Sequence, residues 1–240
     1  VAEVVEPKAL PRLREGLKFE AVDFSYGDEP VLRGLEVDLP KGTKLGVVGE
    51  SGAGKSTLVS LLLRFYDPTE GRITLDGVDI REASIESLRG QMALVSQEIV
   101  IFNQSVADNI ACGKLDATRE EIIAAAKAAN AHEFIEGLPE GYDTRLGEQG
   151  TRLSGGQQQR VAIARALAND PAIVWGDELT GNLDSTNSAE IMELLTRLNK
   201  EQHQTFVIVT HSEEVGALAD RIVRMNDGVI VDDGSRGDDY

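Results

Sequence analysis

Two stretches of the chain carry residue types at spacings that suit the chemistry of phosphates. Residues 49–56 read GESGAGKS and fit the pattern G-x-x-x-x-G-K-[ST] completely, between an apolar run and a helical pattern. In such a loop, glycines let backbone N–H groups converge on phosphate oxygens, and the start of the next helix adds positive potential. Lys55 would reach the β- and γ-phosphates, and the Ser56 hydroxyl would bind Mg²⁺. An ordinary glycine-rich turn is the alternative, but it does not require the complete pattern.

We therefore predict a nucleotide-phosphate loop, which by itself does not choose among kinases, GTPases and ATPases. A GTPase would usually carry N-K-x-D to read its base, and the sequence has no such pattern. The residues predicted to hold the phosphates are Gly49, Glu50, Ser51, Gly52, Ala53, Gly54, Lys55, Ser56 and Thr57.

The second stretch, IVWGDELTGNLD at residues 173–184, ends an apolar run in two carboxylates. Asp177 closes the run and Glu178 follows at once. Such a pair can be catalytic, or it can be only the acidic end of a strand. The choice depends on what else the chain carries.

A third motif, LSGGQQQR at residues 153–160, opens a further helical pattern. Ser154 can cap this helix, and Gly155 and Gly156 expose backbone N–H groups at its positive end. Two glycines in a first turn cost helix stability, so capping alone explains them poorly. Because one triphosphate already has its loop, a second anion-binding helix start indicates a composite site that two chains could share.

The elements around these motifs follow from apolar patterning. Residues 17–40 alternate apolar and polar side chains, which predicts antiparallel strands, and Asp76-Gly77 predicts a hairpin. Residues 104–145 are mostly helical in pattern and include a capping box followed by IIAAAKAANAHEFI, which we expect to form one helix. Strand and helix patterns then alternate to about residue 231, which predicts a parallel sheet covered by helices.

Composition limits the classes of function. The 240 residues include 24 Lys and Arg against 41 Asp and Glu, a net charge of -17. Such a surface repels nucleic acid and anionic lipid headgroups, so no nucleic-acid partner is expected. The single cysteine, Cys112, excludes a disulfide framework and is typical of a reducing, cytosolic setting. No apolar run approaches ~18 residues, so no transmembrane helix is expected. The first residues lack the apolar core of a signal peptide, so none is expected there.

Taken together, the motifs resemble the nucleotide-binding domain of ABC transporters, over about residues 17–231. LSGGQ is similar to that family's signature motif, and the phosphate loop lies upstream of it in the expected order. The resemblance implies an α/β fold: a P-loop NTPase (RecA-like) core with an antiparallel β subdomain and an inserted α-helical subdomain. It also implies that two such domains pair head to tail, with ATP on one phosphate loop capped by the other chain's signature. The capping residues would be Ser154, Gly155, Gly156 and Gln157.

Three more residues gain roles from this resemblance. Tyr26 resembles the aromatic residue that stacks on adenine, although a packed strand aromatic would give the same pattern. Gln97 resembles the glutamine that approaches Mg²⁺ and the attacking water, with a solvated loop glutamine as the alternative. His211 resembles the switch histidine at the γ-phosphate, where a lone histidine would otherwise more often be structural. His132 and His203 match no family position, and we interpret them as surface or packing residues.

The carboxylates can now be interpreted. Asp177 ends a strand beside the phosphate loop, where an acid that organises Mg²⁺ belongs, and Glu178 can turn toward the water as general base. Asp184 resembles the aspartate that crosses the dimer interface. The expected Mg²⁺ ligands are Ser56, Gln97 and, through water, Asp177, and the expected catalytic residues are Glu178, His211, Gln97 and Lys55.

Five segments and two partners are expected. The segments are a linker at 1–16, an antiparallel β subdomain with the first part of the P-loop core at 17–97, a helical subdomain with the signature at 98–168, the second part of the core at 169–231, and an acidic tail at 232–240. The partners are a second nucleotide-binding domain and the transmembrane domain of a transporter, on the cytoplasmic side of a membrane. Residues 146–150 resemble the loop with which exporters sense that domain.

The chain combines features of two family branches. Its first part resembles exporters of the lipid-flippase and multidrug type, whereas the part from Trp175 onward resembles lipoprotein-release and macrolide-export cassettes, which use DEPTGNLD. This combination is consistent with a divergent natural member of the family, with a recombinant chimera and with a designed sequence. Leu179 replaces the usual Pro or Ala, so the turn loses a fixed φ and gains bulk. Trp175 is expected in the core, and Gly176 is expected to weaken its strand slightly.

The leading prediction is an ATPase that powers export. A non-transport family member acting on DNA or ribosomes is one alternative, which the acidic surface and the short segment between Gln97 and Ser154 disfavour. An ATP-binding module with impaired hydrolysis is the other. The intact set of Lys55, Asp177 and Glu178 argues against it, and Leu179 is the reason to consider it.

Overall fold

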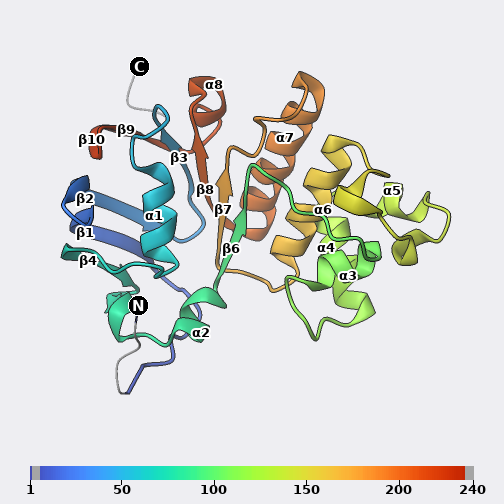
Figure 1. Ribbon diagram of the computed structural model, residues 1–240, viewed down its shortest axis with the longest axis horizontal. Helices are drawn as coiled ribbons and strands as arrows, with labels where there is room; N and C mark the ends of the chain where they lie inside the picture. Colours follow the sequence, from blue (N-terminus) through green and yellow to red (C-terminus); the bar gives the residue numbers. More distant parts are fainter. Residues whose placement is uncertain (2–5, 236–240) are drawn as a thin grey trace.

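The computed structural model describes residue 1 and residues 6–235, which form two sheets and a group of helices (Figure 1). Four strands make the smaller, antiparallel sheet in the order β2-β1-β4-β5. Six strands make the larger sheet in the order β10-β9-β3-β8-β7-β6, in which every neighbouring pair except β9 and β10 is parallel. The mixed α/β fold predicted from the sequence is therefore confirmed.

The elements have the following bounds. The smaller sheet contains β1 (Gly16–Tyr26), β2 (Glu29–Pro40), β4 (Glu70–Leu75) and β5 (Val78–Asp79). The larger sheet contains β3 (Lys44–Val48), β6 (Met92–Val95), β7 (Ile173–Asp177), β8 (Thr205–Thr210), β9 (Arg221–Asn226) and β10 (Val229–Ser235). The helices are α1 (Lys55–Leu62), α2 (Ile85–Arg89), α3 (Val106–Ala111), α4 (Arg119–Ala128), α5 (His132–Glu136), α6 (Gly155–Leu167), α7 (Ser185–Gln202) and α8 (Glu213–Gly216). Short 3₁₀ turns are η1 (Ile80–Glu82), η2 (Gly141–Asp143) and η3 (Glu148–Gly150).

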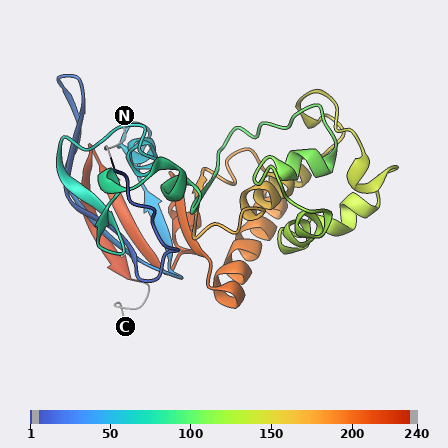
Figure 2. The same cartoon turned by 90° about the horizontal axis from the view of Figure 1, so that it is seen from below.

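Two hydrophobic cores cover opposite faces of the larger sheet. Successive residues of a strand point to opposite faces, and β7 and β8 follow this alternation. Trp175 and Val207 belong to the core shared with α1 and the smaller sheet, whereas Val174 and Ile208 belong to the core shared with α3, α4, α6 and α7. The strands at the centre of the sheet, β3 and β8, are thus buried along their whole length, as a sheet covered on both faces requires. Figure 2 shows the strands gathered at one end of the molecule and α3–α6 at the other.

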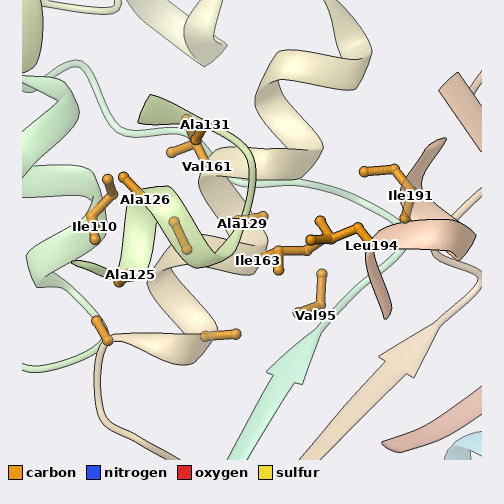
Figure 3. Close-up of a cluster of buried hydrophobic side chains, with 14 of the residues drawn as sticks. Val95, Ile110, Ala125, Ala126, Ala129, Ala131, Val161, Ile163, Ile191 and Leu194 are labelled. Carbon is orange, nitrogen blue, oxygen red and sulfur yellow. The ribbon is translucent and has the colours of Figure 1, made fainter. Parts of the chain in front are cut away.

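The helical part packs through small side chains. Ala125, Ala126 and Ala129 are buried among residues of α3, α6 and α7, and Val95 at the end of β6 joins the same cluster (Figure 3). The predicted capping box is present, because Thr118 and Glu121 accept each other's backbone N–H groups at the start of α4. This packing attaches the helical part to the edge strand that leads toward Gln97.

The prediction of a single alanine-rich helix is wrong, because the helix is interrupted between α4 and α5. Asn130 has φ 52°, a left-handed conformation that asparagine tolerates better than most residues. The Arg197 guanidinium donates hydrogen bonds to the Ala128 carbonyl and to Asn130 Oδ1. A side chain from α7 therefore satisfies the end of α4, a long-range contact that the local pattern does not contain.

The segment expected as a linker is docked rather than free. Residues 2–5 of it lie outside the described part of the chain, and Lys8 forms an isolated parallel bridge with Ala83. The Leu13 backbone N–H donates to Gln91 Oε1 at 2.6 Å, and Gln91 Nε2 donates to the Pro11 carbonyl at 3.0 Å. The Leu13 side chain is only 1% exposed, in the core between the two sheets. The buried leucine and the hydrogen bonds to Gln91 together hold the segment against the start of β6.

The segment expected as an acidic tail begins instead as a strand. Residues 232–235 belong to β10, and residues 236–240 lie outside the described part of the chain. Asp233 pairs with Arg221 and Asp232 pairs with Arg224, both on the antiparallel neighbour β9. Cross-strand charge pairing therefore extends the sheet beyond Val231.

The longest helix, α7, has 18 residues and carries charged side chains along its length. None of the helices formed by residues 1 and 6–235 combines the length and the apolar character that a membrane crossing needs.

Leu13→Ala tests the docking of the N-terminal segment. Truncating a buried leucine lowers the free energy of unfolding by about 2–5 kcal/mol. We therefore expect Tm to fall by about 5 °C or more. Unfolding can be monitored by the fluorescence of the single tryptophan, Trp175. Leu115→Ala is the matched control because Leu115 is 91% exposed, and its Tm should match wild type. Equal Tm values for the two variants would show that Leu13 is not buried in solution.

Candidate functional site

The loop at residues 49–54 connects the central strand β3 to α1. Gly52 and Gly54 have φ 85° and 97°, left-handed values that favour glycine. A Cβ at Gly54 would lie 2.8 Å from Leu32 Cδ2, so the close approach of β2 also requires glycine there. The Lys55 ammonium donates to the carbonyls of Gly49 and Glu50 at 2.6 and 2.7 Å. Backbone carbonyls of the loop therefore hold the side chain of Lys55, the first residue of α1.

A cavity of about 660 Å³ lies over this loop, a volume in the range of small-molecule sites. Its lining residues come from β2, from the phosphate loop with the start of α1, and from the ends of β6, β7 and β8. They are Val31, Glu50, Ser51, Gly52, Gly54, Lys55, Ser56, Thr57, Gln97, Asp177, Glu178 and His211. Four motifs far apart in the sequence therefore share one cavity. Parallel strands bring them together, because their carboxyl ends meet at one edge of the sheet.

The Glu178 carboxylate is held by the end of β8. Its Oε1 accepts the His211 backbone N–H at 2.8 Å, and its Oε2 accepts the Thr210 hydroxyl at 3.2 Å. His211 Nδ1 lies 2.7 Å from the same Oε1, and since a carboxylate only accepts, Nδ1 carries the ring proton. The Glu178 side chain is 14% exposed, whereas that of His211 is 68% exposed. The glutamate is held firmly, and the histidine ring faces outward.

Burial and a neighbouring negative charge act on Asp177. Burial raises the pKa of the Asp177 carboxyl above its usual value, and the Glu178 charge adds to this, whereas the nearby Lys55 lowers it. Two adjacent carboxylates of this kind would be stabilised by a cation. No cluster of three or more His, Cys, Asp or Glu suited to a metal occurs within residues 1 and 6–235. The protein oxygens of Ser56, Gln97 and Asp177 instead suit a cation that is also held by phosphate or water.

Gln97 follows β6 and lies against the turn after Glu178. The Asn182 side-chain amide donates to the Gln97 carbonyl at 3.3 Å. A Cβ at Gly181 would lie 3.2 Å from Gln97 Nε2. Contacts between these two loops thus hold Gln97 on the cavity wall beside Glu178.

Tyr26 lies at the end of β1 and does not line the cavity as defined above. Its ring is 43% exposed and packs edge-on against Phe24 and Tyr66, with ring centroids 4.8 and 5.1 Å away. The same β1–β2 hairpin contributes Val31 to the cavity. A role for Tyr26 toward adenine stays a prediction.

The signature residues form a second group, away from the cavity wall. Ser154 caps α6 and exchanges hydrogen bonds with Gln157, each side chain accepting the other's backbone N–H. A Cβ at Gly156 would lie 2.0 Å from Asn187 Oδ1, so a side chain there would displace Asn187 where α6 meets α7. Asp184 caps α7 and accepts hydrogen bonds from Asn187, which lowers the pKa of its carboxyl.

The structure separates the predicted site residues accordingly. Lys55, Ser56, Gln97, the two carboxylates and His211 share the cavity. Ser154, Gly155, Gly156, Gln157 and Asp184 do not line it. Sequence reasoning missed Thr210 and Asn182, because a strand-end threonine and a loop asparagine carry no motif of their own.

Comparisons with known proteins found similar chains. The family model described as ABC transporter matches residues 32–181. An ATP-dependent lipid A-core flippase of Chromohalobacter salexigens is 46% identical over 239 residues, which cover 98% of this chain and 41% of that protein. A multidrug resistance protein of Caenorhabditis elegans is 43% identical over 226 residues, 93% of this chain and 17% of that protein.

A solved structure agrees with the fold as well. The structure of a bacterial Atm1-family ABC exporter with ATP bound superposes with a TM-score of 0.89 at 42% identity, covering 98% of this chain and 41% of that one. The chain therefore spans about two fifths of the length of this exporter and of the flippase. The resemblance of the part from Trp175 onward to lipoprotein-release cassettes stays a prediction.

Asp177→Asn tests the electrostatics of the carboxylate pair. Because the folded-state pKa of Asp177 is raised, its ionised form costs stability above that pKa, and the cost disappears as pH falls through it. We expect the variant without nucleotide to melt at a higher temperature than wild type near pH 7–8, with the gain shrinking as pH falls through the raised pKa of Asp177. Asp28→Asn, at an exposed turn, should leave Tm unchanged. A lower Tm for Asp177→Asn would contradict the account.

Proposed function

Because the chain belongs to the ABC transporter family, we propose that it binds ATP in the cavity over residues 49–56 and hydrolyses it to ADP and phosphate to power transmembrane export. The single observation that carries the proposal is the convergence of Lys55, Gln97, Asp177, Glu178 and His211 on one cavity. Each of these side-chain types has a place in phosphoryl transfer to water.

The phosphate loop supplies the binding part of the site. Lys55 would exchange its two carbonyl partners for phosphate oxygens, since a charged acceptor holds an ammonium more strongly than a carbonyl does. Ser56, Gln97 and Asp177 would hold Mg²⁺, the last through water, because hard oxygen donors and an uncompensated carboxylate charge suit this ion. When bound, Mg²⁺ neutralises charge that develops on the phosphates.

Glu178 is the proposed general base. Its carboxylate would accept a proton from the attacking water, with its aim fixed by the His211 N–H and the Thr210 hydroxyl. Gln97 lies beside it and would orient the same water. The exposed ring of His211 would turn to the γ-phosphate, where a protonated ring nitrogen would donate to a phosphate oxygen.

The signature residues are proposed to act on a second copy of the domain. Gly155 and Gly156 begin a 13-residue helix whose N-terminus favours an anion, yet they do not line the cavity of their own chain. We infer a head-to-tail pair in which these glycines, with Ser154, cap ATP on the partner and Asp184 crosses the interface. A transmembrane domain is the other proposed partner, on the cytoplasmic side of a membrane, with residues 146–150 as the sensing loop.

The two alternative functions are weaker. Impaired hydrolysis rests on Leu179, but both carboxylate oxygens of the adjacent Glu178 have hydrogen-bond partners. A role on DNA or ribosomes conflicts with the net charge of -17.

Glu178→Gln should bind ATP but hydrolyse it about 10²-fold more slowly, because an amide cannot take a proton from water. It should also accumulate as a dimer with ATP, measured by size-exclusion chromatography beside phosphate release. Glu193→Gln, on the exposed face of α7, is the matched control and should keep the wild-type rate. Wild-type turnover in Glu178→Gln would remove Glu178 from the role of base.

Association of two such chains should strengthen with salt. Each chain carries a charge of -17, and their repulsion is screened as ionic strength rises from about 0.05 to 0.5 M. Sedimentation velocity of Glu178→Gln with ATP should therefore show more dimer at the higher salt. Less dimer at the higher salt would mean that attraction between charged groups drives the pairing.

A further inference from the structure

Residues 176–179 make a tight reversal in which Leu179 folds back onto Gly176. The turn is made at Glu178, whose φ of 49° is left-handed and unusual for a residue with a side chain. A Cβ at residue 176 would lie 2.3 Å from Leu179 Cδ1 and 2.6 Å from Leu179 Cγ. Any side chain at residue 176 would therefore occupy the space that Leu179 fills.

The strand pairing explains why this space is available. Gly176 pairs with Val95 of β6 and Ile208 of β8, and it points to the same face as Val174 because strand residues alternate. Val95, Ile208, Val174 and Leu179 all belong to the core shared with the helical part. The leucine side chain thus enters this core at the place where a side chain of residue 176 would otherwise lie.

Leu179 has little freedom to move away. It is 4% exposed and belongs to a cluster packed from several helices and three strands. Protein cores are packed densely enough that an added methyl group displaces its neighbours. Gly176 and Leu179 looked like separate departures from the family pattern in the sequence. In the structure, Leu179 fills the space that the glycine leaves.

We propose that Gly176 and Leu179 are a positioning pair that aims the Glu178 carboxylate, an inference that rests on the proposed ATPase function. With Leu179 anchored in the core on one side and Asp177 in the sheet on the other, the backbone of Glu178 is fixed from both ends. The Glu178 N–H donates to the Val209 carbonyl at 2.9 Å, and its own carbonyl accepts the Gly181 N–H at 3.0 Å. Proline at residue 179 would restrict the turn through its ring, whereas this chain restricts it through packing.

Gly176→Ala is the direct test, because one methyl group must push Leu179 and tilt the turn. We expect kcat for ATP hydrolysis to fall about tenfold or more, since small displacements of a catalytic group are costly. KM for ATP should stay within about twofold, because the phosphate loop is untouched. Gly234→Ala is the matched control, since a Cβ at this other strand glycine meets nothing within 4 Å, and it should keep the wild-type kcat.

The double variant Gly176→Ala/Leu179→Ala separates positioning from general damage. Removing the leucine bulk makes room for the new methyl group, so kcat should recover at least threefold relative to Gly176→Ala. The emission spectrum of Trp175, which lies on the same strand and is 4% exposed, should stay that of the folded chain in all variants.

Three results would decide against the pair. They are an unchanged kcat in Gly176→Ala, a loss shared equally by kcat and ATP binding, or no recovery in the double variant. Failure of the proposed function would look different, because the wild-type chain would itself release no phosphate from ATP with Mg²⁺.

Discussion

The hydrogen bonds between Glu178 and the end of β8 are the interaction on which the site depends. They exist because β7 and β8 are parallel neighbours, with Asp177 opposite Val209. This register places the carboxylate of Glu178, one residue beyond β7, against the hydroxyl of Thr210 at the end of β8 and the N–H of His211 just after it. A shift of one strand by one residue would move all of its side chains to the other face of the sheet and separate Glu178 from its partners.

The rest of the fold maintains that register. One core holds α1 and the smaller sheet against one face of the large sheet, and the other core holds the helical part against the opposite face. β3 delivers the phosphate loop beside β8, and β6 delivers Gln97 beside β7. The cavity therefore contains the ends of adjacent strands. Its geometry depends on the packing of both cores rather than on any one loop.

The sequence predicts the parts of this site that are built from local pattern. The phosphate loop could be located because its complete pattern is specific, whereas the paired carboxylates and the strand-end histidine gained their roles from the family resemblance. Thr210, the docking of Leu13 and the break at Asn130 could not, since each depends on a contact with a distant segment. Leu179 was an unfavourable feature in the sequence and becomes intelligible only beside Gly176. The described part of the chain thus departs from expectation where tertiary packing overrides local preference.

The central claim is that this cavity hydrolyses ATP and is completed by a second copy of the domain. The most direct measurement is phosphate release from ATP and Mg²⁺ as the concentration of the chain is raised. If two chains build each site, the rate per chain should rise with concentration and then level off as the dimer saturates. A rate per chain that does not change with concentration, or no release at any concentration, would contradict the account.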